Sequence, residues 1–147
     1  MKPRHFLTLM DMNAKELKRL LARAKELKAM QKRGKKHTPL TGKTMAMIFE
    51  KSSTRTRVSF QVGMAQLGGT SLFLSPRDTH LDRGEPVEDT ARVMSRMVDV
   101  IVIRANSHAM VERFASNSRV PVINALTDQH HPCQLLADIQ TWIEHRG

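Results

Sequence analysis

Residues 44–57 read TMAMIFEKSSTRTR, and this stretch decides the fold class. The first six residues are almost continuously apolar, which is typical of a strand buried on both faces of a parallel sheet. Hydroxyl and guanidinium side chains follow at once, and a helical pattern then covers residues 54–67 until Gly68 and Gly69 end it. A buried strand that passes directly into a helix indicates an α/β fold.

The rest of the chain repeats this alternation of short apolar segments and helical patterns. Further strands are expected over 71–74, 100–103 and 120–123, and further helices over 13–33, 87–98, 107–117 and 132–145. Pro121 has no N–H to donate and therefore places the last strand at an edge of the sheet. Right-handed crossovers then predict a three-layer α/β domain over residues 1–147, an open four-stranded parallel sheet with helices on both faces.

The composition fits one globular domain. The chain has 147 residues, of which 40% are hydrophobic, and no apolar run approaches the roughly 20 residues that span a bilayer. The start, Met1 to Arg4, is not followed by a long apolar stretch, so no secretory signal is expected. Cys133 is the only cysteine, which excludes an internal disulfide and favours a cytoplasmic location.

The charge distribution suggests anionic partners. The formal net charge is +10, and the stretch from Lys15 to Lys36 holds ten lysines or arginines and two glutamates. Nucleic acid, anionic lipid and small phosphorylated molecules all fit such an excess. A solvated helix face is the simpler interpretation of the basic stretch, and a nucleic-acid-binding module is the alternative. Trp142 is the only tryptophan and tyrosine is absent, which leaves few platforms for stacking bases.

Polar side chains follow each expected strand. In open parallel sheets, ligands bind beyond the carboxyl ends of the strands. The groups that follow the strands at this rim are residues 52–57 after the first, Arg77, His80 and Arg83 after the second, Arg104 after the third and residues 130–134 after the fourth. Their convergence on one rim is a stronger indication of a site than any one of them.

The segment after the first strand predicts an anion site. Its backbone N–H groups stand at a helix N-terminus, where the helix dipole favours negative charge. The side chains that would add hydroxyl and guanidinium donors are Ser53, Thr54, Arg55 and Thr56. Arg104, from another strand end, would hold the same anion. The alternative is that the hydroxyls cap the helix and the arginines are solvated or ion-paired.

The start of the last helix offers a second pair of polar groups. His131 and Gln134 lie three residues apart, so both can project from its first turn toward one point, and either can hydrogen-bond a carbonyl group. Zinc binding by His130, His131 and Cys133 lacks an evident fourth ligand, so no metal and no cofactor is expected. Cys133 is interpreted as a packing residue, because no general base accompanies it.

The motifs together resemble those of the aspartate/ornithine carbamoyltransferase family. They are FEKSSTRTR at 49–57, DTAR at 89–92, Arg104 and HPCQ at 131–134. The lead-in EKS at 50–52 and the segment RGEP at 83–86 are similar to the members that use ornithine. The resemblance covers essentially the whole chain.

This resemblance implies a substrate and a reaction. Ser53, Thr54, Arg55, Thr56 and Arg104 would hold the phosphate of carbamoyl phosphate, and the segment His131, Pro132, Cys133 and Gln134 would hold its carbamoyl end. Arg55, Arg104 and His131 would be catalytic, in transfer of the carbamoyl group to the side-chain amine of ornithine, which gives citrulline in arginine biosynthesis. Putrescine, aspartate or an acylated ornithine remain alternative acceptors. Arg57 would have a structural, charge-pairing role.

The resemblance also implies partners. Family members form trimers in which the loop at 75–86 reaches a neighbouring subunit, and His80 and Asp82 stand where the family usually has Gln and Gly. The family's Gln contacts carbamoyl phosphate, and His80 would bind this substrate in its place. The resemblance implies that residues 1–147 lack the family's second domain, which binds the amino acid. The chain alone is therefore expected to turn over slowly or not at all, and to expose apolar surface on the helices at 13–33 and 132–145. A non-catalytic role in trimer assembly is a further alternative.

Overall fold

The computed structural model describes residues 2–75, 77–79 and 84–147. Within them a four-stranded sheet has the order β2-β1-β3-β4, and every neighbouring pair is parallel. The strands are β1 (Thr44–Phe49), β2 (Thr70–Leu74), β3 (Val100–Arg104) and β4 (Val122–Leu126). The parallel sheet and the edge position of β4 confirm the sequence prediction.

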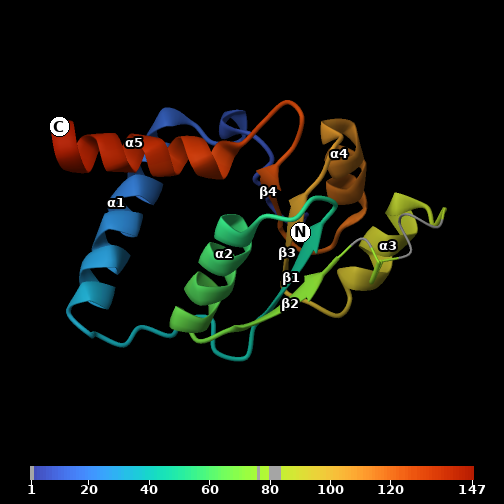
Figure 1. Ribbon diagram of the computed structural model, residues 1–147, viewed down its shortest axis with the longest axis horizontal. Helices are drawn as coiled ribbons and strands as arrows, with labels where there is room; N and C mark the ends of the chain where they lie inside the picture. Colours follow the sequence, from blue (N-terminus) through green and yellow to red (C-terminus); the bar gives the residue numbers. More distant parts are fainter. Residues whose placement is uncertain (1, 76, 80–83) are drawn as a thin grey trace.

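Helices cover both faces of this sheet (Figure 1). The helices are η1, a 3-10 turn (Leu9–Asp11), α1 (Ala14–Lys32), α2 (Thr54–Gln66), α3 (Val87–Met94), α4 (His108–Asn117) and α5 (Pro132–Arg146). Alternate strand residues supply two cores: Ile48 and Ile101 pack with α3 and α4, whereas Met47 and Val102 pack with Met64 of α2. Helices α2 and α5 lie on one side of the sheet and α3 and α4 on the other, which confirms the predicted three-layer α/β arrangement.

Two elements, the last strand and the third helix, differ from the prediction by more than one residue at a boundary. The last strand was expected over 120–123 but runs from Val122 to Leu126. The first hydrogen bond that joins this segment to β3 is the one from Ile101 N to the carbonyl of Pro121, at 3.0 Å, so the strand starts at the next residue. The third helix was expected over 87–98 but ends at Met94, after which tighter i→i−3 hydrogen bonds turn the chain back into β3. Both shifts come from tertiary constraints that local pattern does not carry.

The N-terminal segment covers the free edge of β4, which the sequence did not predict. Phe6 forms a parallel bridge with Ile123: its N–H donates to Val122 O at 2.8 Å, and its carbonyl accepts from Asn124 N at 2.9 Å. The edge strand therefore does not leave its hydrogen-bonding groups fully exposed.

The outermost helices are only partly packed. Helix α1 has no buried residue and contacts α5, where Lys28 pairs with Glu144. The apolar side chains of α5 that remain exposed are Leu135, Ile139, Trp142 and Ile143. The expected exposure of apolar surface on the last helix is thus confirmed. None of the helices in the described ranges has the length and apolar character that crossing a membrane requires.

Candidate functional site

The carboxyl ends of three strands meet at one rim of the sheet, as predicted. A cavity of about 110 Å³ lies there, and its lining comes from all three strand ends: Lys51, Arg104, Ala105, Asn106, Leu126, Thr127 and Asp128. Glu50 joins two of these ends, since its N–H donates to Arg104 O at 2.8 Å and its carboxylate accepts the N–H of Asn106 at 2.6 Å. These bonds fix Arg104 beside the segment that begins α2.

Helix α2 starts at this rim without a side-chain cap. Ser53 is its N-cap residue, but its hydroxyl donates to Thr56 Oγ1 at 2.9 Å and accepts no backbone N–H. The first N–H groups of a helix have no intrahelical partner, and the first turn of α2 holds no acidic residue. A hollow of about 480 Å³ lies alongside and is lined in part by Ser52, Ser53 and Thr54. This helix start can accept an anion.

The two arginines of α2 have different surroundings. Arg55 is exposed, and no carboxylate in the described part of the chain forms an ion pair with it. Arg57 lies 3.8 Å from the centroid of the Phe73 ring and donates to Gln61 Oε1 at 3.3 Å. Its predicted structural role fits these contacts, but the predicted charge pairing is wrong for the described residues: an aromatic ring holds the cation instead.

Two buried polar atoms at the rim have no hydrogen-bond partner among the described residues. They are Nε of Arg104 and Nδ1 of His131. Because a buried polar atom without a partner costs free energy, such atoms are usually satisfied by something that binds. The two residues come from the ends of different strands, β3 and β4, as the sequence predicted.

Burial lowers the pKa of His131 below its ordinary value of 6.5, and the positive charge of Arg104 lowers it further, while Asp138 opposes both. The imidazole is therefore neutral near pH 7, where it can donate one N–H and accept at its other nitrogen. The influence of Arg104 also places its charge near the His131 ring. A neutral imidazole beside a cation suits a ligand with both a carbonyl group and negative charge.

The remaining residues of the 131–134 segment behave in three ways. Pro132 is buried as the first residue of α5. Cys133 Sγ lies 3.5 Å from Asn124 O, and burial raises the pKa of its thiol to about 11, which fits packing and not nucleophilic attack. Gln134 is exposed and its amide donates to Asp138 at 2.8 Å, so its side chain is engaged on α5 itself and not with His131. The predicted convergence of Gln134 and His131 is not observed.

Other predicted features lie away from the rim or outside the described residues. DTAR at 89–92 joins two helices, since Arg92 contacts Asp89 at 2.7 Å and Asn117 of α4 at 3.0 Å. His80, Asp82 and Arg83 fall outside the described residues. Within the described ranges, no three His, Cys, Asp or Glu side chains are grouped as metal ligands.

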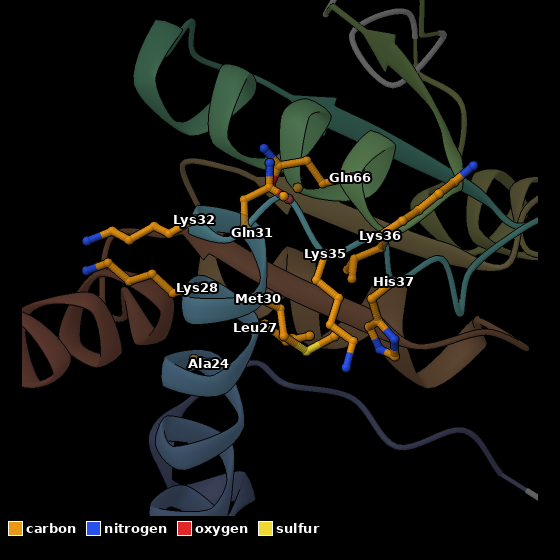
Figure 2. Close-up of a pocket in the computed structure, with 13 residues that line it drawn as sticks. Ala24, Leu27, Lys28, Met30, Gln31, Lys32, Lys35, Lys36, His37 and Gln66 are labelled. Carbon is orange, nitrogen blue, oxygen red and sulfur yellow. The ribbon is translucent and has the colours of Figure 1, made fainter.

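A larger hollow, of about 660 Å³, lies at the end of α1 and not at the rim. Figure 2 shows Lys28 and Lys32 extending from α1 in one direction and Lys36 extending in another. The residues that line this hollow include no Asp or Glu to pair with the lysines, and none of them belongs to the predicted anion site. The rim is smaller, but it is where hydroxyl, guanidinium and imidazole groups converge.

Sequence reasoning missed the residues beneath the rim. Asn124 and Thr127 are buried polar side chains at the end of β4, and His108 is buried at the start of α4. A polar residue inside an apolar strand, as Asn124 is, was the available signal. Its partners are distant in sequence and could not be read from the pattern.

The fold and the rim define a class: an α/β domain with an anion-binding helix start at a sheet rim. The model of the carbamoyl-phosphate-binding domain of aspartate/ornithine carbamoyltransferases matches residues 4–144. Ornithine carbamoyltransferase of Acinetobacter baumannii is 65% identical over 144 residues, which are 98% of this chain and 47% of that protein. The chain therefore belongs to the aspartate/ornithine carbamoyltransferase family.

Solved structures agree with this assignment. Ornithine carbamoyltransferase from Pyrococcus furiosus superposes with a TM-score of 0.96 and 53% identity, over 99% of this chain and 47% of that one. The aspartate transcarbamoylase catalytic subunit of M. jannaschii gives a TM-score of 0.88 and 31% identity, over 96% of this chain and 47% of that one. The chain spans about half the length of the curated relatives it matches.

Proposed function

We propose that this chain binds carbamoyl phosphate at the rim. The phosphate would lie on the uncapped start of α2, held by Ser53, Thr54, Arg55 and Thr56 and by Arg104, and the carbamoyl group would lie against His131. The observation that carries the proposal is the pair of unpartnered buried atoms, Arg104 Nε and His131 Nδ1, beside a helix start whose own serine does not cap it. Pro132 and Cys133 would line the site beside the carbamoyl group.

The chemistry that suits this arrangement is carbamoyl transfer. An amine attacks the carbamoyl carbon, a C–N bond forms, and the C–O bond to phosphate breaks as phosphate leaves with its electron pair. The amine nitrogen loses one proton, which is taken up by the released phosphate. Negative charge grows on the carbonyl oxygen and on the leaving phosphate. Arg55, Arg104 and neutral His131 would stabilise those charges through preorganised hydrogen bonds. Gln134 would contribute only after leaving Asp138, to which it now donates at 2.8 Å.

The proposal for the whole protein is transfer to the side-chain amine of ornithine, giving citrulline in arginine biosynthesis in the cytoplasm. Its support is that the relatives at 65% identity are named ornithine carbamoyltransferase. We further propose a trimer in which the 75–86 loop, with His80, reaches a neighbouring site. Because the chain covers about half of those relatives, we expect residues 1–147 alone to bind carbamoyl phosphate without efficient transfer.

Calorimetric titration with carbamoyl phosphate tests the binding proposal. We expect the Arg55→Ala variant to bind about tenfold to a hundredfold more weakly, the range that corresponds to losing a charge-assisted hydrogen bond. Arg96→Ala is the matched control, since Arg96 is also exposed and precedes β3, at the amino ends of the strands and so opposite the rim. It should bind like the unaltered chain.

The same titrations, at low and moderate salt, include a random oligonucleotide. Tight, salt-dependent oligonucleotide binding with no response to carbamoyl phosphate would favour the basic face of α1 as the functional surface. An equal loss of carbamoyl phosphate affinity in Arg55→Ala and Arg96→Ala would show a general effect of charge and would contradict a site at the rim.

A further inference from the structure

Three polar side chains are buried beneath the turn that joins β4 to α5. Asn124 is fully buried, and Thr127 and His108 are each 4% exposed. Burying such groups is unfavourable unless each is hydrogen-bonded. Their hydrogen bonds therefore indicate which part of the chain they hold in place.

Three of the side-chain bonds and one backbone bond go to the backbone of His130, the residue before His131. Its carbonyl accepts from Thr127 N at 2.9 Å and from Asn124 Nδ2 at 3.2 Å. Its N–H donates to Thr127 Oγ1 at 3.1 Å. Asn124 also fixes the end of the strand, because its Oδ1 accepts the N–H of Leu126 at 2.9 Å. Both backbone groups of His130 are thus held.

His108 supports the same turn from α4. Its Nδ1 lies 2.9 Å from Thr127 Oγ1, and its backbone N–H donates to Asp128 Oδ1 at 2.8 Å. Its ring also packs edge-to-face against the His130 ring, with centroids 4.6 Å apart. One residue of α4 therefore contacts the turn at three points.

We propose that Asn124, Thr127 and His108 are positioning residues that hold His131 against the carbamoyl end of the substrate; this rests on the proposed function. His131 has φ −137° and ψ 70°, so it precedes the helix and lies outside the strand. On the helix side, its carbonyl accepts the N–H of Leu135 at 3.2 Å, the first bond of α5. On the strand side, the bonds to His130 hold the turn that leads into His131. A change of a few tenths of an ångström there moves the imidazole relative to Arg104.

The test compares Thr127→Val, which keeps the shape and loses the hydroxyl, with Thr127→Ser, which keeps the hydroxyl. Affinities for carbamoyl phosphate and for inorganic phosphate are measured by calorimetry. We expect Thr127→Val to bind carbamoyl phosphate about tenfold more weakly, the scale of one displaced hydrogen bond. Inorganic phosphate needs only α2 and the arginines, so its affinity should stay within about twofold. Thr127→Ser should bind both ligands like the unaltered chain.

A structural role alone gives a different pattern. If Thr127→Val is folded and keeps its affinity for carbamoyl phosphate, or loses both ligands equally, the proposal is overturned. If Thr127→Val does not fold, His108→Leu replaces it, with His108→Asn as the rescue because the amide of Asn occupies the place of Nδ1. The expected pattern for that pair is the same.

Failure of the proposed function is recognised separately. If the unaltered chain binds neither ligand, the binding proposal fails, and the ring signals of His131 in the NMR spectrum of the free chain decide the positioning claim. Signals that move in Thr127→Val and return in Thr127→Ser support positioning. Signals that stay unchanged in both variants overturn it.

Discussion

Four of the five α-helices in the described ranges begin in two different ways; the fifth, α3, begins at Pro86, which makes no side-chain capping bond. Helices α1 and α4 start with Asn13 and Ser107, whose side chains accept the N–H groups of Glu16 at 3.0 Å and Met110 at 3.3 Å. Helices α2 and α5 start at the rim with Ser53 and His131, and neither side chain makes a capping hydrogen bond.

The difference is informative because Ser53 is chemically able to cap. A capping serine contributes about 1 kcal/mol to helix stability, yet the hydroxyl of Ser53 turns to Thr56. The same residue type therefore stabilises α4 and leaves α2 open. Departures of this kind from the locally best arrangement are expected at functional sites. The comparison supports the proposal that the start of α2 binds the phosphate of the substrate.

The largest effect should come from Arg104→Met. Arg104 is half-buried with an unpartnered Nε, so its loss should weaken carbamoyl phosphate binding at least about thirtyfold, as for other desolvated charged partners. The free energy of unfolding should not fall, because no internal hydrogen bond of its Nε is lost. Calorimetry and thermal unfolding measure the two quantities.

Arg92→Met is the control for that change. Arg92 pairs with Asp89 and Asn117 between α3 and α4, so binding should be unchanged and the unfolding free energy should fall by at most about 1 kcal/mol. Weaker carbamoyl phosphate binding in Arg92→Met, or a lower free energy of unfolding in Arg104→Met, would contradict the proposed difference between the rim and the rest of the domain.

A carboxylate placed at the open helix start should have an intermediate effect. Ser53→Asp supplies a cap and a negative charge, so it should stabilise α2 by about 0.5–1 kcal/mol and weaken phosphate binding about tenfold. Asn13→Asp adds the same charge at the capped start of α1 and should leave binding unchanged. Titration with inorganic phosphate and denaturant unfolding are the measurements.

The smallest effect concerns stability alone. Ser107→Ala removes a real cap from α4, whose Val111 and Phe114 are fully buried, so the unfolding free energy should fall by about 1 kcal/mol. Ser53→Ala removes no capping bond, so the unfolding free energy should fall by only a few tenths of the loss expected for Ser107→Ala. Equal losses in the two variants, measured by urea unfolding, would show that the open start of α2 is not distinct.

Much of this architecture could be predicted from local sequence. Continuous apolar runs identified β1 and β3, and Asn13 with Glu16 identified the capped start of α1. The bounds of β4 and the end of α3 could not be predicted. The first depend on the hydrogen bond between the carbonyl of Pro121 and Ile101 N, and the second depends on where the chain turns back toward β3. The pairing of Phe6 with β4 joins residues 116 positions apart or more, since 122 − 6 = 116, which is beyond any local pattern.

The site was predictable to a similar degree. The rule that ligands bind at the carboxyl ends of strands brought Ser53, Arg55, Arg104 and His131 to one rim. The engagement of Gln134 by Asp138 and the stacking of Arg57 on Phe73 were not predictable. Each depends on a side-chain orientation that residue type alone leaves open. The network of Asn124, Thr127 and His108 was missed for the same reason.

The most direct test of the central claim follows the backbone amides at the starts of α1, α2, α4 and α5 by NMR while carbamoyl phosphate is added. The account predicts that the amides of residues 54–56 shift first and furthest, with a smaller change at His131, while residues 14–16 and 108–110 stay in place. Equal shifts at capped and uncapped starts, or shifts confined to the basic face of α1, would contradict it.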